Sequence, residues 1–166
     1  LIMDEPTTAL DVTVEAAVLD LVDELKREFS TGIIFITHNL GVVARISDRL
    51  CVMYAGEMIE NGPTSRIFAH PAHPYTRGLM ASIPVPGRTR PGERLGSIPG
   101  IVPTPIGDLW GCAFRNRCDL ASEACADPGL VLEAIGPGRS YRCAHPPVDV
   151  RNAAASLDEG TGGGVR

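Results

Sequence analysis

Three side chains that can do chemistry stand at the ends of two apolar runs in this chain. Asp4 and Glu5 follow the short run 1–3, and His38 follows the run 33–37. In an open parallel sheet the carboxyl ends of the strands face the ligand crevice. This spacing therefore predicts that the two carboxylates and the imidazole meet at one edge of a sheet.

Each of the three residues suits a task at a magnesium–nucleotide site. A hard divalent cation prefers oxygen ligands and keeps several waters, so Asp4 can hold Mg²⁺ through a water. Glu5 can orient a water for attack on a terminal phosphate, and His38 can donate a hydrogen bond to that phosphate. Singly, these residues also fit a polar strand exit and a turn. Together, at this spacing, they favour the site.

The elements that must position these residues can be read from hydrophobic periodicity. Apolar residues at steps of three and four predict an amphipathic helix over 12–29, with Asp11 as its N-cap and Gly32 as its stop signal. Residues 33–37 predict a buried strand, and the strand–helix–strand order predicts a right-handed parallel crossover. A short helix and a hairpin of two strands are expected at 40–46, 50–54 and 57–60.

Composition sets limits on the class of protein. The chain has 166 residues, 44% of them hydrophobic, with a net charge of −5 and a pI near 5.3. This balance argues against a nucleic-acid partner. No apolar run is long enough to span a bilayer and no signal peptide is visible. Because the chain starts at Leu1 and its first strand is cut short, we expect a fragment or a truncated product.

The chain is expected to have four parts. Residues 1–83 hold the α/β elements and end in two helical pieces separated by Pro71 and Pro74. Six prolines and several glycines make 84–105 a linker. A small cysteine-bearing module spans 106–150, and a disordered tail spans 151–166.

The five cysteines, in a chain with no visible secretory signal, predict thiols or metal ligands rather than disulfides. Four thiolates in a module with little apolar content could bind zinc or hold an iron–sulfur cluster, or they could stay reduced and unliganded. Those four are Cys112, Cys118, Cys125 and Cys143. Cys51 lies in an expected strand and is interpreted as a buried apolar residue. His70 and His73 are interpreted as parts of a rigid His-Pro turn rather than as metal ligands.

Several segments resemble a known family. LIMDEPTTALD at 1–11 closely resembles the Walker B and D-loop segment of ABC transporter ATPases, and ITHNL at 36–40 resembles their switch-histidine loop. RLCVMYAGE at 49–57 resembles their closing hairpin. HPAHPYTRGL at 70–79, LGSIPG at 95–100 and GCAFRNRC at 111–118 resemble the C-terminal extension of the ATPases of oligopeptide and dipeptide importers.

The resemblance implies an α/β fold: part of a P-loop-NTPase-type parallel sheet with a closing hairpin, followed by a small irregular cysteine-containing module. It implies that Asp4 assists Mg²⁺ binding, that Glu5 is the general base and that His38 contacts the γ-phosphate of ATP. It also implies that a D-loop reaches a partner nucleotide-binding domain and that the four module thiolates hold a [4Fe-4S] cluster, with Zn²⁺ as the alternative. The D-loop residues are Thr8, Ala9, Leu10 and Asp11.

The implied function is that of an ATP-hydrolysing subunit that energises import of oligopeptides or dipeptides. Its partners would be a second ABC ATPase subunit, membrane permease subunits and, indirectly, a peptide-binding protein. It would lie peripherally at the cytoplasmic face of the cell membrane. The sequence contains no G-x-x-x-x-G-K-[ST] phosphate loop, no Q-loop and no signature motif. We therefore expect no activity from this chain alone. The alternative is a non-catalytic remnant that serves only as a metal-bearing interaction module.

Overall fold

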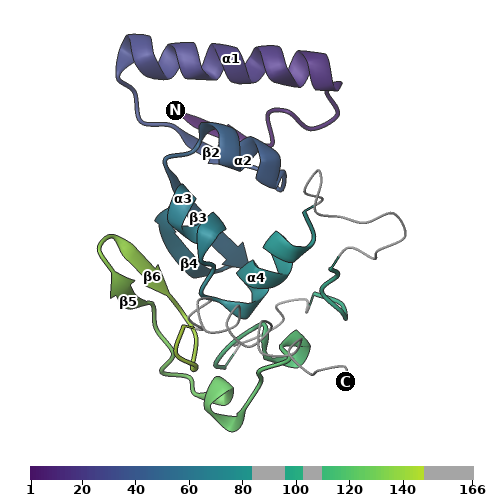
Figure 1. Ribbon diagram of the computed structural model, residues 1–166, viewed down its shortest axis with the longest axis vertical. Coiled ribbons are helices and arrows are strands. Elements are labelled where there is room, and N and C mark those ends of the chain that lie inside the picture. The colour runs from purple at the N-terminus through teal and green to yellow at the C-terminus, as the bar shows by residue number, and fades with distance from the viewer. Residues whose placement is uncertain (84–95, 103–109, 148–166) are drawn as a thin grey trace, which may run out of the picture. The chain divides into compact units, whose positions relative to one another are not determined.

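The computed structural model describes residues 1–83, 96–102 and 110–147. It is a mixed α/β structure with small sheets, and it divides into two compact units, Leu1–Leu50 and Cys51–Arg166 (Figure 1). The predicted linker 84–105 and tail 151–166 lie largely or wholly outside the described residues, so the four-part division stays a prediction. The elements, in chain order, are β1 (Ile2–Asp4), α1 (Val12–Phe29), β2 (Ile34–Ile36), α2 (Leu40–Ile46), β3 (Arg49–Tyr54), β4 (Glu57–Pro63), α3 (Thr64–Ala69), α4 (Pro74–Ala81), the 3-10 helices η1 (Arg115–Arg117) and η2 (Glu123–Ala126), β5 (Glu133–Gly136) and β6 (Arg139–Tyr141).

In the first unit, α1 forms where its sequence predicts it. The Asp11 Oδ1 atom accepts hydrogen bonds from the backbone N–H groups of Thr13 and Val14 at 2.9 Å each, which confirms the predicted N-cap. The helix ends at Phe29 because Ser30 adopts a left-handed conformation with φ 48°. The predicted stop residue, Gly32, therefore lies beyond the residue that ends the helix.

The two helices of this unit bury a narrow apolar seam. Leu19 and Val22 are the buried residues of α1, and Val42 and Val43 are those of α2. The side chain of Asn39 caps α2 by accepting from the Gly41 N–H at 3.0 Å. Both caps are encoded locally, which explains why the bounds of α1 and α2 match the prediction.

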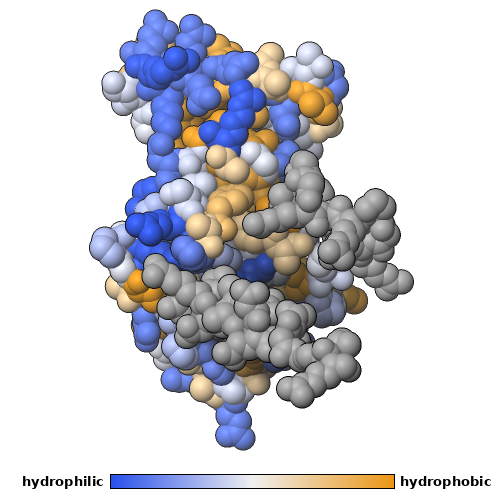
Figure 2. All heavy atoms as spheres, viewed as in Figure 1, coloured by the Kyte–Doolittle hydropathy of each residue, from blue (hydrophilic) through white to orange (hydrophobic). Residues whose placement is uncertain are grey.

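Strands β1 and β2 pair in parallel, as predicted. Ile2 lies opposite Ile34, and Asp4 lies opposite Ile36, so both strands end at the same edge. The prediction that residues 33–37 form a buried strand is wrong for the described chain, because Ile34 and Ile36 are 60% and 47% exposed. The described part of the chain adds no third strand to this pair, and one apolar face stays open. Figure 2 shows apolar patches at the surface of this unit.

The second unit is built on a four-stranded sheet with the order β3-β4-β6-β5. The predicted hairpin of β3 and β4 is confirmed, with Ala55 and Gly56 at the turn in left-handed conformations. Strand β4 runs on to Pro63, past its predicted end. The predicted irregular module in fact contributes strands β5 and β6, and β6 pairs antiparallel with β4 so that Glu60 lies opposite Tyr141.

The His-Pro segment ends in a capped helix. Pro74 is the first residue of α4 rather than part of a separator, and the Nδ1 atom of His73 accepts the backbone N–H of Tyr75 at 3.0 Å. A proline at the first helical position costs no hydrogen bond, because that N–H has no intrahelical partner. His73 thus serves as an N-cap, which refines the predicted turn.

An aromatic cluster joins the described part of the cysteine module to the rest of the second unit. The Phe114 ring centroid lies 5.3 Å from that of Tyr54 and 5.4 Å from that of Tyr75. The Arg117 guanidinium donates to the Pro99 carbonyl at 2.7 Å and lies 6.0 Å from the Tyr54 ring. Phe114 and Arg117 therefore anchor the module to β3 and α4.

Close approach of two segments requires one glycine in this module. Gly111 has φ +74°, and a Cβ atom on it would lie 2.3 Å from the Cys125 carbonyl oxygen. The neighbouring N–H of Cys112 donates to that carbonyl at 2.8 Å. Glycine at this position lets the two cysteine-bearing loops pair directly.

Among the helices in the described ranges, none combines the length and the apolar character that a bilayer crossing needs.

Candidate functional site

The candidate nucleotide site brings Glu5 and His38 into direct contact. The Nδ1 atom of His38 lies 2.8 Å from the Glu5 Oε1 atom. Glu5 immediately follows β1, and His38 lies two residues beyond β2, so the parallel pairing of these strands places both at one edge. The predicted convergence of the imidazole with the acidic pair is thus present between His38 and Glu5.

The backbone at Glu5 adopts an unusual conformation that aims its side chain. Glu5 has φ +46°, a region that non-glycine residues enter rarely. Its N–H donates to the Ile36 carbonyl at 2.9 Å, and its own carbonyl accepts from the Thr8 N–H at 3.1 Å. Such backbone strain persists where surrounding contacts over-determine it, and it concentrates at functional sites.

Two hydrogen bonds hold the Glu5 carboxylate. The Thr8 hydroxyl donates to Oε2 at 2.6 Å while His38 contacts Oε1. These two contacts lower the pKa of Glu5 below its usual range, because they favour the ionised form. The hydrogen bond from Thr8 lowers it more than the contact with His38 does. Glu5 is therefore a carboxylate at neutral pH, the form that a general base requires.

The remaining residues predicted for this site are open to solvent. Asp4 is exposed at the end of β1, and none of the hydrogen bonds or ion pairs found among the described residues involves its carboxylate. Ala9 is exposed with φ +65°, Leu10 is 39% exposed, and Asp11 is exposed while one of its oxygens caps α1. The stretch 8–11 is thus exposed on the surface of the first unit.

Three of the four module thiols have a raised pKa. Burial raises the pKa of the Cys112, Cys118 and Cys143 thiols, so they are protonated at neutral pH. A smaller rise in the pKa of Cys112 comes from the charges that Cys125 and Cys143 would carry if they were ionised. The role of the four cysteines as metal ligands stays a prediction.

The presence of four cysteines in one module does not by itself make a metal site. Within the three described ranges, no set of three or more His, Cys, Asp or Glu side chains is arranged to hold a metal ion. The contact of Cys125 is instead with His145, whose Nε2 atom lies 3.7 Å from the Cys125 Sγ atom and 3.4 Å from the Ser122 hydroxyl. The described residues thus show no formed metal site, the comparisons below give no support for one, and the ligand roles of these thiols stay a prediction.

Three arginines of the cysteine module, Arg115, Arg117 and Arg142, make contacts with other parts of the chain. Arg142 lowers the pKa of Cys112 as a minor cause. Arg117 instead donates to the Ile98 carbonyl at 3.0 Å and to the Tyr54 hydroxyl at 3.2 Å. Arg115 donates to the Trp110 carbonyl. Arg142 likewise donates to the Leu130 carbonyl at 2.8 Å, so all three arginines hold backbone carbonyls.

Cys51 is exposed, so its interpretation as a buried residue is wrong for the described chain. Neighbouring atoms still shield part of its sulfur from water, and this partial desolvation raises the pKa of its thiol.

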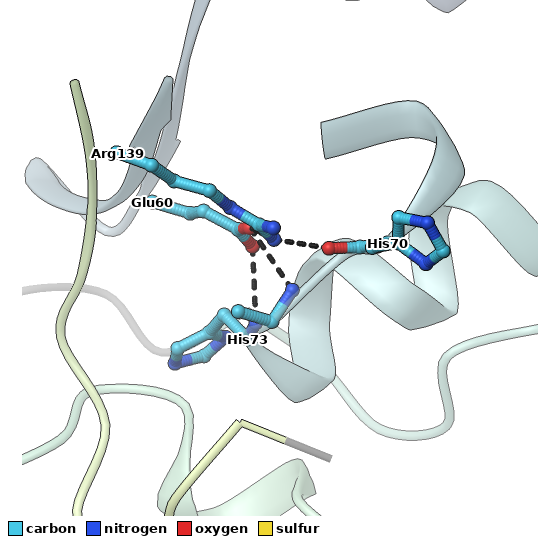
Figure 3. Close-up of polar contacts among 5 residues, drawn as sticks. Glu60, His70, His73 and Arg139 are labelled. Atoms are coloured by element: carbon cyan, nitrogen blue, oxygen red, sulfur yellow. Dashed lines mark hydrogen bonds and ion pairs between the residues drawn. The ribbon is translucent and has the colours of Figure 1, made fainter. Parts of the chain in front are cut away.

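The buried carboxylate of Glu60 was not predicted from the sequence. Its side chain is wholly buried, and it accepts the N–H groups of Ala72 and His73 at 2.9 and 3.0 Å (Figure 3). Arg139 pairs with it at 2.8 Å and also donates to the His70 carbonyl. The rings of His70 and His73 point to different sides of this segment in Figure 3, which agrees with the interpretation of the His-Pro pairs as structural.

Comparison with known proteins gives the chain its family. Residues 59–125 match the family model described as oligopeptide/dipeptide transporter, C-terminal region. The chain is 48% identical over 147 residues to a protein of Brucella ovis assigned as a peptide import ATP-binding protein, with 86% of this chain and 44% of the relative covered. It is 48% identical over 143 residues to a probable peptide ABC transporter ATP-binding protein of Sinorhizobium fredii, with 86% of this chain and 42% of the relative covered.

These matches define the class of protein as that of ABC transporter ATP-binding proteins. Within this class, the chain belongs to the oligopeptide and dipeptide transporter family. It spans less than half the length of the relatives that it matches. The identity and the family together confirm the resemblance on which the expected roles of Asp4, Glu5 and His38 depend, whereas the roles themselves stay predictions.

Proposed function

We propose that this chain is the C-terminal part of an ATP-hydrolysing subunit that energises the import of oligopeptides or dipeptides. The observation that carries the proposal is the 2.8 Å contact between the Glu5 carboxylate and the His38 imidazole at the shared end of β1 and β2. The names of the relatives, which include peptide import and ATP binding, support the same reaction class. In this proposal, β1 and β2 are two strands of a P-loop-NTPase-type parallel sheet.

The proposed chemistry assigns one task to each side chain. Glu5 accepts a proton from water as the water oxygen bonds to the terminal phosphorus of ATP, and the bond from that phosphorus to the bridging oxygen breaks, so that ADP leaves with the electron pair. His38 contacts the terminal phosphate. Asp4 holds Mg²⁺ through a water, which suits a lone exposed carboxylate at a strand end.

The proposal also assigns partners. Residues 8–11 would contact the nucleotide-binding domain of a second ABC ATPase subunit, and their exposure permits this. The assembled pair would drive membrane permease subunits and, through them, act on a peptide delivered by a binding protein. The subunit would then lie peripherally at the cytoplasmic face of the cell membrane.

A metal in the cysteine module is a separate proposal. Cys112, Cys118, Cys125 and Cys143 lie in one module, but they would have to move toward a common centre to bind a [4Fe-4S] cluster or, alternatively, Zn²⁺. Anaerobically purified chain should contain about four iron atoms and absorb visible light if one cubic cluster forms. Colourless protein with stoichiometric zinc would favour zinc, and protein with neither metal would show reduced thiols.

The catalytic proposal can be tested by Glu5→Gln in a longer protein that joins this segment to a phosphate-binding loop. We expect ATP binding to persist and turnover to fall by about 10²-fold or more, because a general base contributes about 10²–10⁴-fold. Glu24→Gln, an exposed carboxylate on α1, is the matched control and should leave turnover unchanged. Full turnover in the Glu5 variant would remove Glu5 from the reaction.

A further inference from the structure

Both oxygens of the Glu5 carboxylate make hydrogen bonds to other side chains of the same chain. His38 contacts Oε1 at 2.8 Å, and the Thr8 hydroxyl donates to Oε2 at 2.6 Å. A carboxylate held at both oxygens cannot rotate about its terminal bond without breaking a hydrogen bond. The plane of the group is therefore fixed, while each oxygen keeps a further lone pair for an incoming proton.

Local geometry explains why Thr8 can make this contact. The Thr8 N–H donates to the Glu5 carbonyl at 3.1 Å, which closes a turn between the two residues. The positive φ of Glu5 belongs to the same turn. Threonine is β-branched, so few rotamers are open to it and holding the hydroxyl in one place costs little entropy.

We propose that Thr8 is a positioning residue for Glu5, whose hydroxyl fixes the orientation of the carboxylate that would accept the proton. This inference rests on the proposed function. Without the Thr8 hydroxyl, the hydrogen bond at Oε2 would be lost, and the contact of Oε1 with His38 alone would not fix the plane of the carboxylate.

The contact itself can be tested in this chain by NMR spectroscopy at one neutral pH. Thr8→Val removes the hydroxyl at constant shape and should move the Glu5 side-chain carboxyl ¹³C resonance, and Thr8→Ser should restore it. Thr13→Val is the matched control, because Thr13 bonds to Asp11 through its backbone N–H alone. Thr8 is exposed, so its variants should fold, and an unmoved Glu5 resonance in Thr8→Val would overturn the proposal.

The positioning role can be tested in the longer protein by steady-state ATPase kinetics. We expect Thr8→Val to lower kcat by about tenfold with KM for ATP unchanged, because small misplacements of a reacting group cost one to two orders of magnitude. Thr8→Ser should recover most of the loss. A kcat for Thr8→Val equal to the parent's, while Glu5→Gln abolishes turnover, would refute the positioning role and leave the proposed function standing. Turnover that survives Glu5→Gln would instead end both.

Discussion

At the scale of single residues, Glu5 shows how neighbouring groups orient one carboxylate. A left-handed backbone at φ +46°, a hydroxyl three residues on and an imidazole from the next strand all act on one carboxylate. The carboxylate is partly open to solvent, with a side-chain exposure of 38%, so water can reach it. Position and access together, rather than burial, define this group.

His73 is the contrasting residue, since its imidazole is almost wholly buried. Burial lowers the pKa of His73 from 6.5 to about 4, so the ring is neutral in the folded protein. Its Nδ1 atom caps α4, and its Nε2 atom has no hydrogen-bond partner among the described residues. Protonating this ring requires either unfolding or a buried charge.

This burial predicts a pH dependence of stability. Between pH 6.5 and about 4 the unfolded chain binds a proton at His73 and the folded chain does not. The free energy of unfolding therefore falls as pH falls through this window, by about 2–3 kcal/mol for this residue. His73→Asn keeps a capping side chain without the titration.

Urea unfolding, followed by circular dichroism at neutral pH and within the acid window, checks this prediction. The loss of stability on acidification should be smaller in His73→Asn than in the parent chain. Equal losses in the two proteins would show that His73 already binds its proton in the folded state.

At the scale of elements, Glu60 joins three segments that are far apart in sequence. It lies on β4, accepts from the N–H groups that precede α4 and pairs with Arg139 on β6 (Figure 3). A buried charge of this kind is tolerated only when its hydrogen bonds are complete. The strand β6 and the start of α4 are thus held by one side chain.

We expect Glu60→Gln to lower the free energy of unfolding of the chain by about 3 kcal/mol, because an amide N–H₂ would replace one oxygen of a wholly buried carboxylate and could not accept from the donors there. Glu57→Gln is the matched control, since Glu57 pairs with Arg142 at a more open position and should cost about 1 kcal/mol or less. Chemical denaturation of the three proteins measures both. Equal losses in the free energy of unfolding for the two variants would show that the hydrogen bonds of Glu60 add no stability beyond that of an ordinary ion pair.

The sequence predicted those elements whose signals are local. The bounds of α1 and α2 follow from caps at Asp11 and Asn39 and from apolar spacing, and the β3–β4 hairpin follows from its turn at 55–56. Strand β6 could not be predicted in this way, because its pairing joins Glu60 to Tyr141 across about half of the chain. Long-range pairing leaves little trace in local periodicity.

The candidate site was predictable to a similar degree. Asp4, Glu5 and His38 were found from strand ends and spacing, and the Glu5–His38 contact agrees with that expectation. The roles of Thr8 within the chain and of Glu60 and His145 in the second unit depend on side-chain contacts. Residue types alone gave little signal for these contacts. At Glu60 the one signal was an acidic residue that directly follows two apolar residues, Met58 and Ile59, in an expected strand, and it was missed.

At the scale of the whole molecule, the chain contains the residues proposed to act on ATP but no phosphate-loop motif. We expect the 166-residue chain to release no phosphate from Mg²⁺–ATP above background, because its sequence has no G-x-x-x-x-G-K-[ST] motif. A phosphate-release assay checks this, with the longer protein as the positive control. Release that disappears in Glu5→Gln would show that the chain can hydrolyse ATP by itself.

The open face of β1 and β2 has a consequence for handling the protein at the bench. Ile2, Ile34 and Ile36 are 70%, 60% and 47% exposed on a pair of strands whose outer edges have no partner among the described residues. Unpaired backbone N–H and C=O groups at a strand edge, next to exposed apolar side chains, favour pairing with a second copy of the chain. Concentrated solutions of the chain should therefore scatter light increasingly with time, and a mild detergent should clear them.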